Sequence, residues 1–256
     1  MLEISKTHSI SAMDSLHYHE YHEIYVLTTG TQKYIIDGGI YDMQKGDVAI
    51  IKKGVFHKTT KGMGGERILV CFDDGFLSEY LTERARPLFL GFSDKKVIRP
   101  DERDFKSALA LISDADKAIK KGNGDAAFLS LTGFLSILGN SESAGKIQPS
   151  ENSTVIKAVN YVSENFATVS SLEEVANAVY ISKYYLCRLF SEELGLSFNK
   201  FLNKVRLRHA EKLLSETKKS VGEIAMECGF SDPAYFCKVF GKQFGVTPAV
   251  FKKLSR

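Results

Sequence analysis

Two stretches near the end of the chain decide how it folds. Residues 171–195 read SLEEVANAVYISKYYLCRLFSEELG, and residues 220–245 read SVGEIAMECGFSDPAYFCKVFGKQFG. Each begins with a Ser followed three residues later by a Glu, which is the capping-box signal of a helix start. Each then carries apolar residues at helical spacing and ends at a Gly, a residue that commonly terminates helices. Each stretch therefore predicts a helix, a short turn and a second helix.

The two stretches are copies of one unit. Ile224 repeats Val175 at an offset of 49 residues, whereas Phe240 repeats Phe190 at an offset of 50. The turn of the second unit is therefore predicted to be one residue longer than the turn of the first. Residues 199–214 form a continuous helical pattern that joins the two units.

A duplicated helix-turn-helix has a direct use on DNA. Two such units on one frame can place their second helices in successive major grooves, roughly 34 Å apart. The alternative is a helical bundle that merely repeats a helix pair. Eight residues that fall off the apolar stripe, close to the start of each second helix, argue against that alternative, because a recognition helix reads bases from such positions. These predicted DNA-binding residues are Lys183, Tyr184, Cys187, Arg188, Pro233, Ala234, Tyr235 and Lys238.

The distribution of charge agrees with a DNA-binding end. From residue 151 onward the chain has 15 Lys and Arg against 11 Asp and Glu, whereas residues 1–150 have 19 against 20. The excess positive charge therefore lies in the last part of the chain. This is a mild indication of a polyanionic partner there, and ordinary scatter of surface charge explains it equally well.

The last hundred residues resemble the DNA-binding domain of the AraC/XylS family of regulators. The resemblance implies a seven-helix fold with two DNA-reading helices, and it assigns base and phosphate contacts to the eight residues named above. Because Arg188 and Lys238 can pair with guanine or phosphate, whereas Ala234 offers only apolar contact, we expect the first unit to read more sequence. The residues that carry the resemblance are Leu186, Cys187, Arg188, Leu189, Phe190, Gly195, Phe198, Arg206, Leu207, Arg208, Ala210, Leu213, Leu214, Ile224, Ala225, Gly229, Phe230, Tyr235, Phe236, Phe240, Phe244, Gly245, Thr247 and Pro248.

The first hundred residues have the pattern of a β domain. Short runs of strand-forming residues, such as residues 23–29 and 48–51, are separated by turn residues at close intervals. Asp37-Gly38-Gly39 between two apolar runs is a strong hairpin signal, because these residues tolerate positive φ. We therefore expect a sandwich or small barrel over residues 1–100.

Helical periodicity begins at residue 101 and continues to residue 140, interrupted by Gly122-Asn123-Gly124. We predict a helical hairpin over residues 101–140, whose apolar faces pack either against the β domain or against a second subunit. Residues 141–153 are small and polar with Gly and Pro, a linker composition. A helical DNA-binding domain is then expected over residues 154–256, which gives an α+β protein in which an all-α double helix-turn-helix domain follows the barrel and hairpin.

Histidines cluster at the start of the chain, with five of six among the first 57 residues. His17, His19 and Glu23, followed by His57 after a Gly-bounded strand, resemble the two motifs of the cupin superfamily, with Lys52 where a Pro is usual. In metal-binding cupins the corresponding four residues hold a divalent metal, and three imidazoles with a carboxylate suit Zn, Fe, Mn or Ni. The alternative is that they are polar residues lining an effector pocket.

Alternation along a strand allows His17, His19, Glu23, Tyr25 and the more distant His57 to form one effector pocket inside the barrel. His22 is expected on the opposite face, at the surface. No cofactor is required by this interpretation, although a divalent metal in the cupin-like domain fits it.

The sequence as a whole predicts a dimeric cytoplasmic regulator and not an enzyme. The expected partners are double-stranded promoter DNA, RNA polymerase, a second copy of the chain and a small-molecule effector such as a sugar or other metabolite, with activation the expected sense. The four cysteines form no CxxC pair, and no long apolar run or basic leader predicts a membrane partner. The rival interpretations are a metal-dependent cupin enzyme, supported by the His/His/Glu/His pattern, and an architectural DNA-binding protein without an effector.

Overall fold

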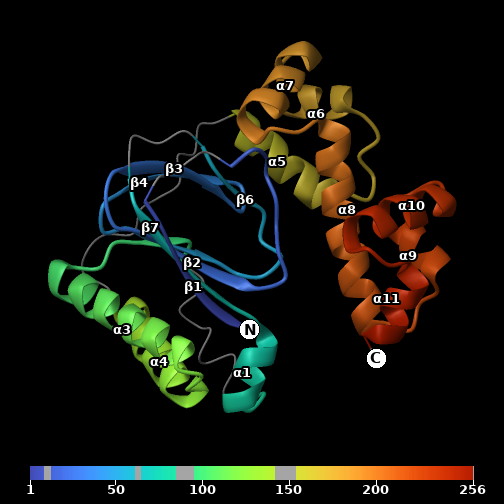
Figure 1. The fold of residues 1–256 in the computed structure, drawn as a ribbon. Coiled ribbons are helices and arrows are strands. Elements are labelled where there is room, and N and C mark those ends of the chain that lie inside the picture. Colours follow the sequence, from blue (N-terminus) through green and yellow to red (C-terminus); the bar gives the residue numbers. More distant parts are fainter. Residues whose placement is uncertain (9–12, 61–64, 85–94, 142–153, 256) are drawn as a thin grey trace. The chain divides into compact units, whose positions relative to one another are not determined.

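The computed structural model describes residues 1–8, 13–60, 65–84, 95–141 and 154–255 (Figure 1). The chain forms two compact units, Met1–Glu151 and Asn152–Arg256, and each is described by itself. The predicted linker, residues 141–153, lies outside the described residues except for Ser141. Within the described ranges, no helix is long and apolar enough to cross a lipid bilayer.

The first unit contains two antiparallel sheets, as its short strands and turns predicted. The five-stranded sheet has the order β1 (Leu2–Thr7), β7 (Arg67–Phe72), β2 (His22–Leu27), β5 (Val48–Ile51) and β8 (Val97–Ile98). The three-stranded sheet has the order β4 (Gly39–Gln44), β3 (Thr31–Ile36) and β6 (His57–Thr59). Asp37 and Gly38, which join β3 to β4, have φ of 48° and 73°, the positive values that a two-residue hairpin turn needs.

Alternation along β2 separates two apolar cores. Ile24 and Val26 point to the outer face of the five-stranded sheet, where helices cover them. Tyr25 and Leu27 point between the two sheets, where they pack with Tyr34 and other fully buried side chains. The space between the sheets is thus the interior of the barrel.

The predicted hairpin is formed by α3 (Glu102–Lys120) and α4 (Gly124–Asn140), which lie side by side (Figure 1). Ile112 of α3 and Leu135 of α4 are buried together with Val70 and Phe72 of β7. One face of the hairpin therefore packs against the β unit. Leu129 of α4 stays outside this core, with 70% of its surface exposed.

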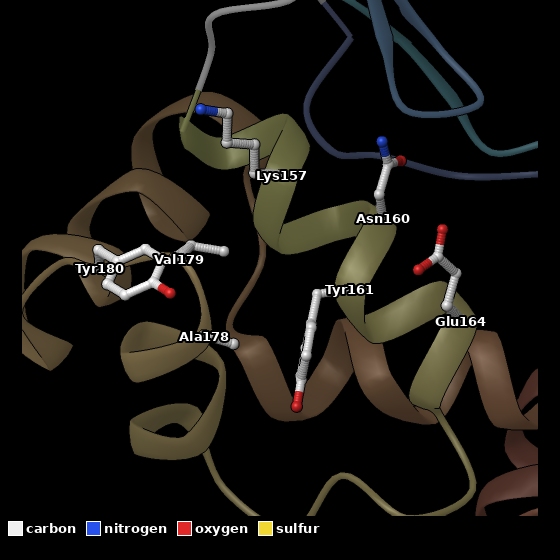
Figure 2. A pocket seen from close by; sticks show the side chains of 7 residues that line it. All are labelled: Lys157, Asn160, Tyr161, Glu164, Ala178, Val179 and Tyr180. Carbon is white, nitrogen blue, oxygen red and sulfur yellow. The ribbon is translucent and has the colours of Figure 1, made fainter.

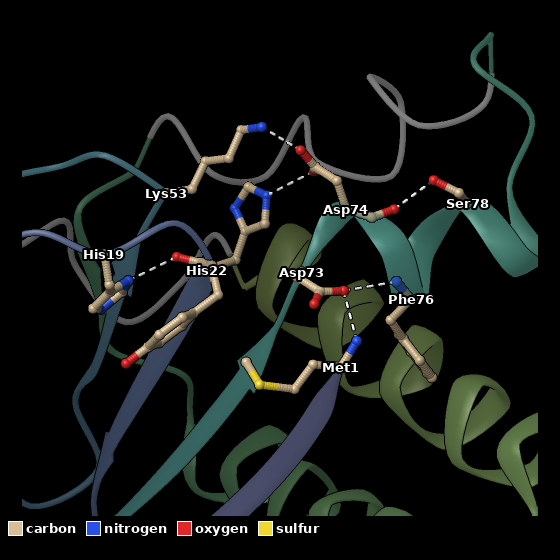
Figure 3. Close-up of polar contacts among 9 residues, drawn as sticks. Met1, His19, His22, Lys53, Asp73, Asp74, Phe76 and Ser78 are labelled. Carbon is tan, nitrogen blue, oxygen red and sulfur yellow. Dashed lines mark hydrogen bonds and ion pairs between the residues drawn. The ribbon is translucent and has the colours of Figure 1, made fainter. Parts of the chain in front are cut away.

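His22 was expected at the surface, and that expectation was wrong. Its side chain does point away from the barrel interior, but it is buried against Phe72, with ring centroids 5.3 Å apart. The short helix α1 (Asp74–Tyr80), which the sequence analysis did not predict, covers it. Figure 3 shows Asp74 at the start of α1 facing both the His22 ring, 3.4 Å from its Nε2 atom, and the ammonium group of Lys53. The outer face of β2 is therefore core.

The second unit is all helical, which confirms the expected fold class. Its helices are α5 (Thr154–Asn165), α6 (Leu172–Ala178), α7 (Lys183–Leu189), α8 (Phe198–Glu216), α9 (Val221–Glu227), α10 (Pro233–Phe244) and α11 (Pro248–Leu254), and a π-helical turn, Phe190–Leu194, extends α7. Residues 179–182 connect α6 to α7, and residues 228–232 connect α9 to α10. The second turn is one residue longer, as predicted. The helix α8 joins the two units of the duplication (Figure 1).

The helix starts follow the predicted capping signals with one difference. Ser220 accepts a hydrogen bond from the Glu223 amide, and the Glu223 carboxylate accepts one from the Ser220 amide, a complete capping box. Ser171 likewise accepts from the Glu174 amide at 3.2 Å, but the Glu174 carboxylate accepts from the amide of Ser170 at 2.9 Å. In the first copy the carboxylate therefore bonds to the amide of the residue before the capping serine, instead of to the amide of that serine itself.

The first helices of the two helix-turn-helix copies, α6 and α9, end in the same way, although their sequences differ. The amide of Ile181 donates to the carbonyl of Ala176 at 3.0 Å, and the amide of Phe230 donates to that of Ala225 at 2.9 Å. This six-to-one hydrogen bond marks a Schellman motif, whose preceding residue has a left-handed backbone. In the second unit that residue is Gly229, with φ of 82°, and in the first it is Tyr180, with φ of 59°.

Candidate nucleic-acid interface and barrel pocket

The start of α7 presents the first set of predicted DNA-binding residues. Ser182 caps the helix by accepting from the amide of Tyr185 at 3.2 Å, while Leu186 and Leu189 turn inward and are buried. This orientation leaves the four predicted residues exposed, which are Lys183, Tyr184, Cys187 and Arg188. Tyr184 has 87% of its surface exposed, and nothing in its own helix requires a large apolar ring in water.

The start of α10 presents the second set in the same way. Asp232 caps the helix by accepting from the Ala234 amide at 2.8 Å, and Phe236 and Phe240 are buried. The predicted residues Pro233, Ala234, Tyr235 and Lys238 are all exposed. Tyr235 differs from the others because its hydroxyl accepts a hydrogen bond from Asn203 of α8 at 2.8 Å, which fixes the ring.

Both basic residues of the α7 face have acidic neighbours. On α7, Lys183 lies 3.8 Å from Glu173 and Arg188 lies 3.8 Å from Glu192, between exposed side chains. Exposed pairs of this length contribute little and are easily exchanged for another anion. Arg188 also lies over the Tyr185 ring, 5.3 Å from its centroid, which steadies the guanidinium.

A separate cavity of about 400 Å³ lies beside α5 and the end of α6 (Figure 2). Tyr180 and Val179 line one side of it and Lys157, Asn160 and Glu164 of α5 the other. None of the eight predicted DNA-binding residues lines it. The cavity is therefore distinct from the two helix faces.

The barrel interior brings three of the four predicted ligand residues together. Ligand atoms of His19, Glu23 and His57 all lie within 4.8 Å of one another. His17 lies beside them, paired with His57 through a β-bridge and with ring centroids 4.4 Å apart, but it is not part of the three-residue cluster. Tyr25, the fifth predicted pocket residue, is fully buried between the sheets.

Backbone carbonyls orient all three imidazoles. The Nδ1 atoms of His17, His19 and His57 lie 3.1, 2.8 and 2.9 Å from the carbonyl oxygens of Ser15, Tyr21 and Val55. Because a carbonyl only accepts, each Nδ1 carries a proton, and each ring is held with its Nε2 on the side away from that carbonyl. The His19 Nε2 atom lies 3.3 Å from a carboxylate oxygen of Glu23. The His57 Nε2 atom is buried, and no described residue forms a hydrogen bond with it.

Glu23 stays ionised in this setting. Burial alone would raise the pKa of its carboxyl, but the neighbouring His19 and His57 and a hydrogen bond from Tyr34 at 3.1 Å bring the pKa below its ordinary value. Burial lowers the pKa of His57 to about 4, so that its imidazole is neutral near pH 7. Neutral imidazoles and an ionised carboxylate are the forms that bind a divalent metal.

These residues fit the metal that the cupin resemblance implies. The unpartnered Nε2 of His57 converges with the His19 imidazole and the Glu23 carboxylate, and the Nδ1 bonds to carbonyls are the outer contacts usual for metal-binding histidines. When bound, such a metal would supply a Lewis-acidic coordination point for an oxygen ligand. Without one, the same atoms are hydrogen-bond acceptors for a polar effector.

Sequence reasoning missed one residue of the barrel interior, Arg67. It begins β7, and its guanidinium lies 5.5 Å from the centroid of the Tyr25 ring. Alternation along β7 was the available signal, because Ile68 and Val70 face the helices and Arg67 must then face inward.

Comparison with known proteins supports both halves of the chain. A family described as a helix-turn-helix domain matches residues 175–254, and one described as a cupin domain matches residues 10–71. A solved structure of a transcriptional regulator from Chromobacterium violaceum, described as having an AraC-type DNA-binding domain, is 30% identical over 40% of this chain and 91% of its own, with a TM-score of 0.38. The chain carries an AraC-type helix-turn-helix domain and a cupin domain.

Two curated relatives show how far the likeness extends along the chain. The transcriptional activator RhaR of Mannheimia succiniciproducens is 28% identical over 93% of this chain and 86% of its own length. The regulatory protein PocR of Salmonella typhimurium is 37% identical, but over 40% of this chain and 34% of its own. The chain thus spans about a third of the PocR length. Both relatives are named as regulators, in agreement with the expected DNA-binding function.

Proposed function

We propose that this chain regulates transcription by binding promoter DNA through the exposed starts of α7 and α10, under the control of a small molecule bound in its barrel. The observation that carries the proposal is the duplication: two capped helices present matching exposed faces on one helical frame. Recognition helices of this kind enter successive major grooves. The printed name of RhaR, a transcriptional activator, favours activation, with RNA polymerase as partner in the cytoplasm.

The DNA contacts are tested by substituting one cation on each face. Footprinting of the upstream regions of neighbouring genes supplies a site, and equilibrium binding then compares Arg188→Ala and Lys238→Ala with the wild type. Each loss of a base or phosphate contact should weaken binding by about 5- to 150-fold. Lys157→Ala, which removes an exposed cation from α5, is the matched control and should bind normally. Unchanged affinity in both face variants would overturn the assignment.

The two faces should read sequence unequally. Base-by-base substitution of the footprinted site should show larger losses under α7, because Ala234 on α10 has no side-chain donor or acceptor. Equal or greater losses in the half-site of the second unit would contradict this expectation. An architectural DNA-binding protein would show neither a defined site nor such an asymmetry.

Control by an effector requires two arrangements with different affinities for it. We place the effector among Tyr25, His17 and the His19–Glu23–His57 cluster.

We place the contact between two subunits of a dimer on the outer side of the α3–α4 hairpin, separately from the effector site. The exposed Leu129 side chain of α4 is the reason for this placement, because a 70% exposed Leu on a helix whose inner face is already buried is available to a second copy. Sedimentation of wild type and Leu129→Lys tests it, with a shift towards monomer in the variant expected.

A metal is a second candidate for the barrel ligand, favoured by the unpartnered Nε2 atom of His57, which lies in one cluster with His19 and Glu23. Plasma mass spectrometry of protein purified without chelator or His tag should find near one divalent metal per chain, and His57→Ala should lose it. Absence of metal from the wild type would leave the cluster as acceptors for a polar effector. Metal-dependent turnover would instead favour the cupin-enzyme interpretation.

A further inference from the structure

Arg67 is half-buried at the start of β7, and no carboxylate of the described residues pairs with its guanidinium. Its Nε and Nη1 atoms are both buried, and neither donates a hydrogen bond to any residue that the structure describes. Its contact there is with the face of the Tyr25 ring. A desolvated guanidinium with unused donors is unfavourable, because a ring face replaces neither the lost water nor an anion.

A second arginine of the same unit shows what a satisfied guanidinium looks like. Arg99 donates from Nε and Nη2 to the two carboxylate oxygens of Asp47, at 2.5 and 2.9 Å. Asp47 is fully buried and also accepts from the Gln44 amide at 2.7 Å. The fold therefore supplies a complete carboxylate fork to Arg99 and supplies none to Arg67.

Tyr25 adds a second unused donor at the same place. Its hydroxyl is buried beside the Arg67 guanidinium, which can only donate, and among the described residues the hydroxyl hydrogen has no acceptor. Burial raises the pKa of this phenol to about 12, opposed by the positive charge of Arg67, so that the hydroxyl keeps its proton. A protonated phenol and a guanidinium side by side both offer hydrogen to an acceptor.

We propose that Arg67 and the Tyr25 hydroxyl bind the carboxylate of a small organic acid, which is the effector of this regulator. The inference rests on the proposed function and names the chemical class of its ligand. A carboxylate supplies the single negative charge and the two oxygens that a guanidinium pairs with best. A phosphate dianion fits less well, because ionised Glu23 lies in the same interior and already opposes negative charge at Tyr25.

The rest of the ligand would extend towards the His19–Glu23–His57 cluster. Tyr34 connects the two ends, since its ring lies 5.1 Å from that of Tyr25 and its hydroxyl donates to Glu23. Carboxylate and imidazole acceptors at that end suit hydroxyl groups. A hydroxylated acid therefore has a complementary group at each end of the interior.

The subsite is tested with acetate as the probe, on the full chain. Sodium acetate at about 100 mM should raise the Tm of wild type by about 2 °C or more over sodium chloride of equal ionic strength. Acetamide, which has the same shape without the charge, should give no shift. Sodium sulfate is the third arm, and a larger shift from it than from acetate would overturn the preference for a carboxylate.

Arg67→Met separates a ligand site from a structural role. The variant should lose the acetate shift and, because it replaces an unpaired buried charge by an apolar chain, should be at least as stable as wild type without acetate. Arg103→Met, at an exposed position on α3, is the matched charge control and should keep the full shift. Tyr25→Phe should reduce the shift and keep part of it.

The outcomes distinguish this proposal from the proposed function. No acetate shift in wild type, or an equal shift in Arg67→Met, overturns the anion subsite. A marked loss of stability in Arg67→Met without ligand would also overturn it, because the arginine would then be structural. DNA binding by Arg67→Met at wild-type affinity, measured on the footprinted site, would leave the regulator assignment standing in either case.

Discussion

Replacing Tyr180 by Gly should stabilise the helical compact unit, Asn152–Arg256. The residue has φ of 59°, where a Cβ atom is disfavoured by about 1–2 kcal/mol, and its side chain is 94% exposed. Removing the ring therefore sacrifices little burial. The greater freedom of Gly in the unfolded chain offsets about 0.4–1 kcal/mol of the gain. The expected net increase in the free energy of unfolding is about 0.8 kcal/mol, the difference between the midpoints of these two ranges.

The duplication supplies the internal comparison for this prediction. Gly229 occupies the equivalent place in the second helix-turn-helix and makes the same Schellman hydrogen bonds. The backbone at Tyr180 therefore already has the geometry that Gly accepts. Thermal unfolding of the full chain, followed by far-ultraviolet circular dichroism, should show the transition of the second unit raised by about 2–4 °C. Tyr180→Ala, which keeps a Cβ atom and loses the ring, is the control and should show no such rise. A Tyr180→Gly variant less stable than wild type would refute the reasoning and would mean that the ring contributes packing.

Three further substitutions test other parts of the structure. Gly229→Ala should destabilise by more than about 2 kcal/mol, because its Cβ would collide with the backbone of Ala167 at a φ of 82°; urea denaturation measures the loss. Asp47→Ala should cost about 2–3 kcal/mol by leaving Arg99 without its fork, again by urea denaturation. Because burial holds the folded-state pKa of His57 at about 4, below the ordinary 6.5, protons favour the unfolded chain, and stability should fall as pH drops from 6.5 towards 4. That fall should be smaller in His57→Gln, and an equal fall would contradict the assignment.

The helical half could be predicted almost completely from the sequence. Capping residues such as Ser220, glycine terminators such as Gly245, and the apolar stripe are local signals, and the structure obeys them. Even the extra residue in the second turn follows from the change in offset. The same offset of 49 pairs Tyr180 with Gly229, which was a signal for the left-handed position that the analysis did not use.

The β half was less accessible because its site depends on contacts between distant segments. The order of His17, His19, Glu23 and His57 indicated a cluster, but only the folded barrel shows three of them converging with His17 beside them. The sequence also could not show that a helix would cover His22. Such burial depends on how segments far apart in the chain pack, and no local pattern encodes it.

The helix α8 sets a limit on how target sites can change. It has 19 residues and is about 28 Å long at a rise of about 1.5 Å per residue, and it is continuous from Phe198 to Glu216. One inserted residue would turn one end against the other by about 100°, whereas one inserted base pair turns DNA by about 34–36°. The continuous helix α8 therefore fixes the spacing of the two proposed DNA-reading faces along the duplex. Promoters under its control can drift gradually by base substitution, but an insertion or deletion between the two half-sites should abolish recognition in a single step.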